Sequence, residues 1–197
     1  MSLAVYILDV RLLREFIESV LLETQSTFLR KLRVFDFDDT LVKTKSLIHV
    51  TTATGEVFDL TPGEYAVYEP AQGDQFDYSD FSKLIDPEEI VWTGQVLRRI
   101  IAKGGEVVIL TARAHRGPVQ QFLEEAGLPP LEVIALANAD PLKKSEYIEE
   151  RLASGEIDFV EFFDDSYKNV EAVRALGPKY PGVKIVAHHV KHVTRIS

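Results

Sequence analysis

Short apolar runs alternate with stretches of helical periodicity through most of the chain. The apolar runs, bounded by glycine, proline or acidic residues, predict buried strands at residues 32–37, 106–110, 131–135, 159–163 and 183–187. Between them, apolar positions at helical spacing predict helices at residues 86–102, 118–126, 140–153 and 166–176. Strands that alternate with helices are typical of parallel βαβ units whose sheet is covered on both faces. We therefore expect an α/β fold, a Rossmann-like three-layer αβα sandwich with a central, mostly parallel sheet.

The pattern changes after the first strand. Residues 46–52 and 56–60 are rich in β-forming side chains and flank Ala53-Thr54-Gly55, which predicts a β-hairpin. Prolines, glycines and aromatic residues follow, so a small hairpin and loop insertion, a flap or cap, is expected at about residues 44–86. Ahead of the first strand, the helical spacing of apolar residues predicts an N-terminal helix at about residues 8–30. The whole chain is predicted to form one domain.

The composition narrows the chemistry. Hydrophobic residues make up 46% of the 197 residues, enough to build one buried core. Cysteine is absent, which excludes disulfides, thiolate metal sites and a cysteine nucleophile. The net charge of -9 argues against an extended nucleic-acid-binding surface. Because no apolar run could span a bilayer and the start lacks the basic segment of a signal peptide, we expect a cytoplasmic protein without a membrane partner. The oligomeric state is left open.

Acidic residues follow two of the predicted strands. Asp36, Asp38 and Asp39 come at the end of the first strand, and Asp164 and Asp165 follow a later one. Parallel strands end at one edge of a sheet, where open α/β folds bind ligands, so the two acidic groups are expected to meet. Carboxylates this close repel one another unless a cation joins them, and Mg²⁺ prefers oxygen ligands. Either group alone would suit a solvated acidic loop or a helix cap.

A hydroxyl follows a third predicted strand. Thr111 comes after the run at 106–110, and Ala112 and Arg113 come next. A hydroxyl and a backbone N–H at a strand end can hold a phosphate oxygen. A lone threonine at this position would also suit an ordinary helix cap, and the arginine would also suit an ion pair with a surface acid.

Two lysines lie in the first turn of the helix at 140–153. Lys143 and Lys144 are disfavoured there by the helix dipole, so neighbouring carboxylates or a phosphate are expected to compensate. Lys144 shares a face with Ile148 and Leu152, which turns it toward the sheet. Lys144 is therefore preferred over Lys143 as the active-site lysine, although a solvated surface pair would also explain both.

The order of these elements, Asp-x-Asp-x-Thr followed by Thr, Lys and Asp-Asp, resembles that of the haloacid dehalogenase-like superfamily. The resemblance covers residues 32–176, and residues 36–41, Asp-Phe-Asp-Asp-Thr-Leu, match the first signature of the family in full. It implies a haloacid dehalogenase-like core domain and a magnesium-dependent phosphomonoester hydrolase. The dehalogenases of the family lack an acid at the position of Asp38 and use no metal, so the phosphatase branch is implied.

The resemblance also implies catalytic roles. Asp36 would be the nucleophile that forms an aspartyl-phosphate, and Asp38 would be the general acid and base. Thr111 would hold the transferring phosphoryl group, with Ala112 and Arg113 as further substrate-binding residues. A carboxylate is a competent phosphoryl acceptor, and phosphoryl transfer depends on positioning and charge neutralisation, so these residue types suit the chemistry.

The remaining implied roles concern charge and metal. Lys144 would bind the substrate, neutralise its charge and steady Asp36. The implied cofactor is Mg²⁺, held by the side chains of Asp36 and Asp164 and by the main-chain carbonyl of Asp38. Asp165 would be a further ligand or would support one.

Three features also resemble the Swiss-army-knife RNA-repair-like phosphatases: the segment that begins at Phe162, the residues around Thr111 and the hairpin insertion. The substrate would then be a phosphorylated small molecule or a nucleic-acid end, and a 3′-phosphate phosphatase is the first alternative. A non-catalytic phosphate- or metal-binding regulatory module is the second, because receiver domains also gather Asp, Thr and Lys at strand ends. Their acidic pair and phosphoacceptor lie on separate strands, so the spacing of Asp36 and Asp38 argues against this alternative.

Expectations also follow for the aromatic residues of the insertion, for Asn169 and for the histidines near the last strand. The aromatic residues of the insertion would stack on a base or pack together, and packing is the expectation for Tyr65, Tyr68, Phe76, Tyr78 and Phe81. Asn169 stands where the family more often has a third aspartate, and it would orient a carboxylate or a metal-bound water, or lie exposed on a helix. The histidines near the last strand are predicted to be structural or surface residues away from the motifs: His188, His189 and His192.

Overall fold

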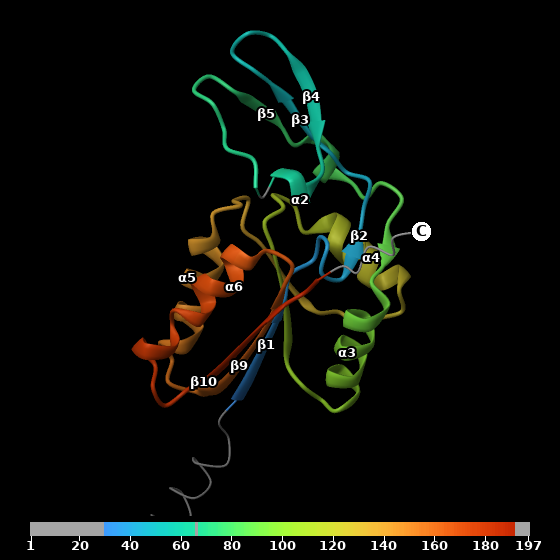
Figure 1. Cartoon of the computed structure of the whole chain (residues 1–197). Coiled ribbons are helices and arrows are strands. Elements are labelled where there is room, and N and C mark those ends of the chain that lie inside the picture. The colour runs from blue at the N-terminus through green and yellow to red at the C-terminus, as the bar shows by residue number, and fades with distance from the viewer. Residues whose placement is uncertain (1–29, 66, 192–197) are drawn as a thin grey trace, which may run out of the picture.

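A five-stranded parallel sheet forms the centre of the protein (Figure 1). The computed structural model describes residues 30–65 and 67–191. The strands of the sheet are β1 (Arg30–Phe35), β7 (Val107–Thr111), β8 (Glu132–Ala135), β9 (Ile157–Asp164) and β10 (Lys184–His189). They lie in the order β10-β9-β1-β7-β8, and every neighbouring pair is parallel. The predicted parallel sheet is confirmed.

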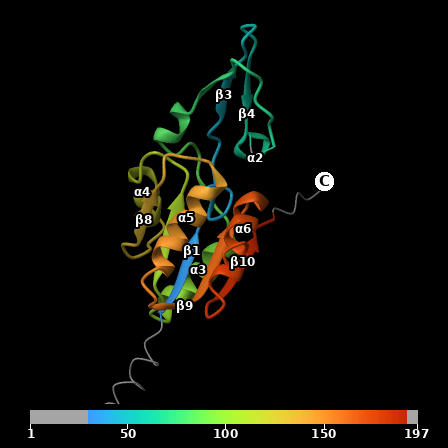
Figure 2. The same cartoon turned by 90° about the vertical axis from the view of Figure 1, so that its left-hand side faces the viewer.

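Helices cover both faces of this sheet (Figures 1 and 2). α5 (Pro141–Leu152) and α6 (Tyr167–Arg174) lie on one face, and α3 (Val91–Ala102) and α4 (Gly117–Glu125) lie on the other. Alternate side chains of each strand therefore enter different cores. On β1, Leu32 and Val34 join the core under α5 and α6, whereas Phe35 joins the core under α3 and α4. Burial on both faces explains why the strands are nearly continuous apolar runs.

The sheet grows in two directions from β1. The chain first adds β7 and β8 on one side, and then adds β9 and β10 on the other. In open α/β sheets, the strand ends on either side of such a reversal leave a crevice in which ligands bind. Asp36 follows β1 and Asp164 ends β9, so both acids lie at this reversal.

A small antiparallel sheet projects beyond the same edge (Figure 1). Its strands are β3 (Ile48–Thr51), β4 (Val57–Leu60) and β5 (Gln75–Asp77), in the order β4-β3-β5. Two short helices, α2 (Pro62–Tyr65) and η1 (Ser79–Ser82), belong to the same insertion. At its base, β2 (Val42–Lys43) pairs with β6 (Glu88–Glu89). Residues 44–86, between these two strands, are named the flap.

The predicted hairpin is confirmed, because β3 and β4 pair antiparallel across a turn in which Gly55 has a φ of 85°. The third strand, β5, is too short to carry a recognisable pattern and was not predicted. The predicted packing of the aromatic residues is confirmed for a cluster of rings that contact one another: Phe58, Tyr65, Tyr68, Phe76 and Tyr78. Phe81 is the exception, since its ring lies against the guanidinium of Arg113, 4.9 Å away.

The helix predicted from residue 86 begins later than expected, at Val91. Glu88 and Glu89 form β6 instead, because their pairing with β2 closes the base of the flap. Asp86 has a φ of 44°, which no helix accommodates. The pairing of β6 with β2 therefore prevents the helix from starting at residue 86, where the local sequence favours a helix start. Within the described residues, the other predicted strands and helices agree with the structure apart from a few residues at their ends.

Two further expectations concern the N-terminal helix and membrane-spanning segments. The predicted N-terminal helix at residues 8–30 falls almost wholly outside the described residues, which begin at Arg30 in β1. Within the described part of the chain, every helix is too short or too polar to cross a bilayer.

Candidate active site

The loop after β1 brings predicted acids to the edge of the sheet. Asp36 continues the line of β1, since its N–H donates to the Phe163 carbonyl of β9 at 2.9 Å. The chain then turns at Asp39, whose φ of 53° is a left-handed conformation that aspartate tolerates better than most residues. Asp36 is thereby fixed beside β9, while Asp38 lies at the start of the turn.

The end of β9 supplies the second acidic pair. Asp164 is fully buried, and Asp165 follows it in a half-buried position. The Asp164 carboxylate accepts the N–H of Ser166 at 2.8 Å and the side-chain amide of Asn169 at 2.9 and 3.0 Å. Asn169 lies in α6 and orients this carboxylate, which is one of the roles expected for it.

Lys144 joins the two strand ends. Its Nζ lies 2.6 Å from an oxygen of Asp36 and 2.7 Å from an oxygen of Asp164, and all three side chains are buried. Burial lowers the pKa of Lys144, but the carboxylates of Asp164 and Asp36 outweigh burial and raise the pKa overall. The amine therefore stays charged, and the predicted meeting of the two acidic strand ends is confirmed.

The start of α5 explains the position of this amine. Asp140 caps the helix by accepting the N–H of Leu142 at 3.0 Å, so the first turn stands at the sheet edge. Lys144 projects from the inner face of this turn into the acidic cluster. The Lys143 side chain is 44% exposed, and it pairs with Glu146 at 2.7 Å. The structure therefore brings Lys144, and not Lys143, to the cluster.

Three acids are placed to share a metal ion. Asp36, Asp164 and Asp165 each offer a carboxylate oxygen, and these oxygens lie within 4.8 Å of one another. Mg²⁺ binds oxygens at about 2.0–2.1 Å, so two ligands on opposite sides of it are roughly 4.2 Å apart. No main-chain N–H of the described residues donates to the Asp38 carbonyl, which offers a further oxygen for a ligand. This donor set fits a hard, oxygen-seeking cation.

The cluster holds more negative charge than Lys144 neutralises. Burial raises the pKa of Asp164 to about 6, opposed by Lys144 and reinforced by repulsion from Asp36. Burial also raises the pKa of Asp165 to about 8, with repulsion from Asp36 and Asp164 as the next causes. A bound divalent cation would supply the missing positive charge.

Thr111 offers a hydroxyl at the end of β7, the strand beside β1. It is fully buried, and its Oγ accepts the N–H of Arg113 at 3.2 Å. Within the described residues its hydroxyl donates no hydrogen bond, so that donor remains for a ligand oxygen. Ala112 follows in a half-buried position, where its main-chain N–H belongs to the same strand end.

Arg113 turns toward Asp38. Its Nε and Nη2 donate to the two carboxylate oxygens of Asp38 at 2.8 and 2.7 Å. Its Nη1 donates to the carbonyls of Phe81 and Lys83 at 2.9 and 3.0 Å. Burial raises the pKa of Asp38 overall, although Arg113 acts in the opposite direction. Oxygens of the protein thus accept most of the N–H groups of the Arg113 guanidinium. The substrate-binding role of Arg113 stays a prediction.

Two threonines without a predicted role fasten the loops of the site. The Thr40 hydroxyl oxygen accepts the N–H of Asp165 at 3.1 Å, which ties the loop after β1 to the end of β9. The Thr93 hydroxyl donates to the Thr40 carbonyl at 2.5 Å, which ties the same loop to α3. Thr40 was marked by its place in the first motif, whereas no sequence pattern marks Thr93.

His189 lies at the site, contrary to the prediction that the histidines stand away from the motifs. Its Nε2 is 2.8 Å from the Asp165 carbonyl. The prediction failed because β10 runs parallel to β9, so that His189 pairs in register with the last residue of β9. His188 stacks on Phe163, with ring centroids 4.5 Å apart, which fits a structural role. His192 lies outside the described residues.

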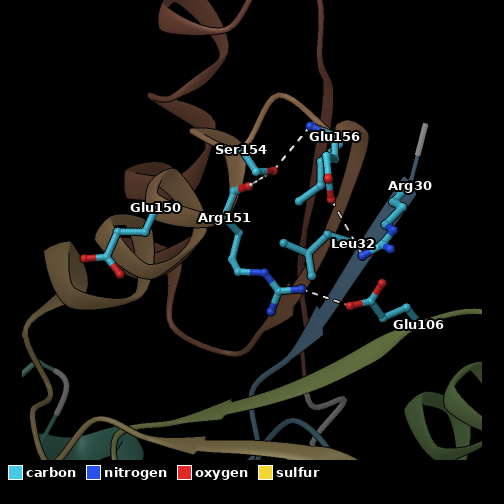
Figure 3. Close-up of a pocket in the computed structure, with 8 residues that line it drawn as sticks. Arg30, Leu32, Glu106, Glu150, Arg151, Ser154 and Glu156 are labelled. Atoms are coloured by element: carbon cyan, nitrogen blue, oxygen red, sulfur yellow. Dashed lines mark hydrogen bonds and ion pairs between the residues drawn. The ribbon is translucent and has the colours of Figure 1, made fainter. Parts of the chain in front are cut away.

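A cavity of about 170 Å³ lies at the opposite edge of the sheet (Figure 3). Two ion pairs line it, since Arg151 pairs with Glu106 at 2.9 Å and Arg30 with Glu156 at 3.7 Å. None of the predicted site residues lines it. The candidate chemistry therefore belongs to the aspartate cluster at the carboxyl ends of the strands.

Comparison with known proteins adds little. No protein-family model matches the chain, and no curated protein matches it significantly. Among solved structures, a hypothetical protein from Xanthomonas campestris is similar at 18% identity with a TM-score of 0.39, over 84% of this chain and 67% of that one. Similarity this distant supports no conclusion about function.

Replacing Lys144 with methionine should destabilise the protein. The substitution leaves the carboxylates of Asp36 and Asp164 buried without their shared cation, which costs about 3–5 kcal/mol. Urea unfolding at neutral pH in a metal chelator should show the free energy of unfolding lowered by that amount. The control is Lys143→Met, for which the change should stay below about 0.5 kcal/mol. Equal effects of the two substitutions would contradict the bridging role.

The metal-free protein should lose stability as the pH rises from about 5 to about 8. Asp164 and Asp165 have folded pKa values of about 6 and about 8, above the ordinary value of 3.8. Between the ordinary and the folded pKa the folded state binds more protons, so each rise in pH favours unfolding. Urea unfolding at several pH values measures this slope. Asp165→Asn and added Mg²⁺ should each flatten it above pH 6, and a slope unchanged by both would contradict this account.

Proposed function

We propose that the protein is a magnesium-dependent phosphomonoester hydrolase of the haloacid dehalogenase-like superfamily, acting through an aspartyl-phosphate on Asp36. One observation carries the proposal: Lys144 contacts Asp36 at 2.6 Å and Asp164 at 2.7 Å where the sheet reverses its direction of growth. Acids from two strands are gathered there around one amine. The strand order and the helices on both faces support the Rossmann-like three-layer αβα sandwich that this family implies.

The first step transfers the phosphoryl group to the protein. A carboxylate oxygen of Asp36 attacks the phosphorus, and the bond from phosphorus to the leaving oxygen breaks. Asp38 donates a proton to that oxygen, so the alcohol leaves uncharged. Thr111 and Ala112 donate to the phosphoryl oxygens, and Lys144 offsets their charge. Lys144 also holds the Asp36 carboxylate in place before the substrate arrives.

The second step returns the protein to its starting state. Asp38, now ionised, takes a proton from a water molecule whose oxygen attacks the phosphorus. The bond between phosphorus and the Asp36 oxygen breaks, inorganic phosphate leaves, and the carboxylate is regenerated. Asp38 therefore acts as acid in one step and as base in the next.

The metal ligands of this proposal are the carboxylates of Asp36, Asp164 and Asp165, which lie close enough to share one ion, and the Asp38 carbonyl. When bound there, Mg²⁺ lets a carboxylate approach an anionic phosphate that it would otherwise repel. Lys144 is not sufficient for this, because its single charge already faces two carboxylates.

The flap favours a phosphorylated small molecule over a nucleic-acid end. Its aromatic rings contact one another, and the hydroxyls of Tyr65 and Tyr78 lie 2.6 Å apart, so the rings pack together within the flap, with Tyr78 45% exposed. The net charge of -9 also disfavours a polyanionic substrate.

Hydrolysis of p-nitrophenyl phosphate tests the proposal. Wild-type protein should hydrolyse the ester with Mg²⁺, lose activity in a chelator and regain it when Mg²⁺ returns. Asp36→Asn should lower kcat on the order of 1,000-fold or more, because an amide oxygen is a poor nucleophile toward phosphorus. The control is Asp158→Asn, at the other end of β9, which should keep wild-type activity.

The outcomes separate the alternatives. If Asp36→Asn is as active as the wild type, Asp36 is not the nucleophile. A preference for 3′-phosphorylated oligonucleotides over sugar phosphates and nucleotides would favour the nucleic-acid-end phosphatase. A wild-type protein that binds Mg²⁺ and hydrolyses none of these esters would favour the regulatory module.

A further inference from the structure

Arg113 occupies an uncommon position for an arginine. Its side chain is 1% exposed, and four N–H groups of its guanidinium are bonded to protein oxygens. Two of these bonds reach the carboxylate of Asp38, and the other two reach the main-chain carbonyls of Phe81 and Lys83. The rings of Phe37 and Phe81 lie 5.7 and 4.9 Å from the guanidinium carbon. An arginine held this completely has little freedom to reach a substrate.

The carbonyls that Arg113 binds belong to the segment by which the chain returns from the flap. The outgoing segment is attached to the same place, since the Leu47 N–H donates to the carboxylate of Asp80 at 3.0 Å. The Ser46 hydroxyl also donates to the Asp80 carbonyl at 3.4 Å. Both segments at the base of the flap are therefore joined at Asp80 and Phe81, and Arg113 connects this junction to Asp38.

We propose that Arg113 is a positioning residue that sets the orientation of the Asp38 carboxylate and links it to the base of the flap. The inference rests on the proposed phosphatase activity, in which Asp38 protonates the leaving group. Only the planar fork of arginine can bind two carboxylate oxygens on one side and two carbonyls on the other. A lysine would keep the charge and lose this geometry. A shift at the base of the flap would thereby change the direction of Asp38 without any contact between the flap and Asp36.

The dependence on the leaving group tests this role. p-Nitrophenyl phosphate and phenyl phosphate are similar in shape, but the phenolate is the more basic leaving group and has greater need of a proton. The parameter to compare is kcat/KM, because it reports the cleavage of the ester and not the later hydrolysis of the aspartyl-phosphate. Arg113→Met should lower kcat/KM for phenyl phosphate by about 100-fold, the lower end of the range for general acids, and by less than about tenfold for p-nitrophenyl phosphate.

Double substitution separates positioning from direct contact with phosphate. Asp38→Asn should show the same dependence on the leaving group, and Arg113→Met combined with Asp38→Asn should be no slower than Asp38→Asn alone. Arg113→Lys should behave like Arg113→Met. If Arg113 instead binds the substrate phosphate, the double variant will lose the product of the single effects, both esters will suffer equally, and Arg113→Lys will recover activity. Those results would overturn the proposal.

The matched control is Arg98→Met. Arg98 also forms a two-bond pair with a carboxylate, that of Glu89, and donates to the Ala126 carbonyl at 3.3 Å, and neither partner is a residue of the site. It should leave the ratio of the two kcat/KM values unchanged. A similar change of ratio in Arg98→Met and Arg113→Met would show a general loss of stability and overturn the specific role.

A measurement without substrate keeps the inference separate from the proposed activity. Hydrogen exchange of the full-length protein should be faster over residues 79–83 in Arg113→Met than in the wild type or in Arg98→Met. If the wild type hydrolyses no ester while this difference is seen, the proposed function fails and the link from Arg113 to the flap stands. Unchanged exchange in Arg113→Met would overturn the link even if the protein is a phosphatase.

Discussion

The buried charge at the end of β1 and β9 is the constraint on which the site depends. Carboxylates leave water at a large cost unless cations and hydrogen bonds accompany them into the protein. Lys144 meets this requirement for Asp36 and Asp164, and Asn169 and Ser166 complete the hydrogen bonds of Asp164. One amine faces the carboxylates of Asp36, Asp164 and Asp165, so negative charge remains in excess, and burial raises the pKa of Asp164 and Asp165 accordingly; a divalent cation would relieve this excess.

Topology explains why the charges meet at this place. A parallel sheet that grows in two directions from β1 puts the ends of β1 and β9 side by side, although their acids are far apart in the sequence. The helix α5 then starts at the same edge and carries its lysine inward. Thr40 and Thr93 fasten the loop after β1 to β9 and α3, so the fold itself holds the acids at fixed separations.

Much of this arrangement was readable in the sequence. Buried strands and amphipathic helices left periodic patterns, and the i+4 spacing of Lys144 with Ile148 selected the lysine that the structure places in the cluster. The parts that were missed depend on contacts between distant segments. α3 begins late because β6 pairs with β2, and β10 carries His189 to Asp165 because of its register with β9.

The surroundings of Arg113 also depend on contacts between distant segments. Its place after a strand end suited either a phosphate contact or an ion pair with an acid, and nothing local to it could reveal that Asp38 and the returning segment of the flap would surround it. A short motif gives the edge at which a residue lies, whereas the direction of its side chain is decided by whatever packs against it. For that reason the sequence indicated where the acids and the lysine meet, whereas it left the partners of the arginine open.

A crystal structure grown with Mg²⁺ and beryllium fluoride, which mimics a phosphoryl group on a carboxylate, tests the central claim most directly. We predict beryllium fluoride bonded to the Asp36 carboxylate, with the metal ion between Asp36 and Asp164 and the amine of Lys144 against the fluorides. Beryllium fluoride bound to another residue, or a metal ion held away from both aspartates, would contradict the account.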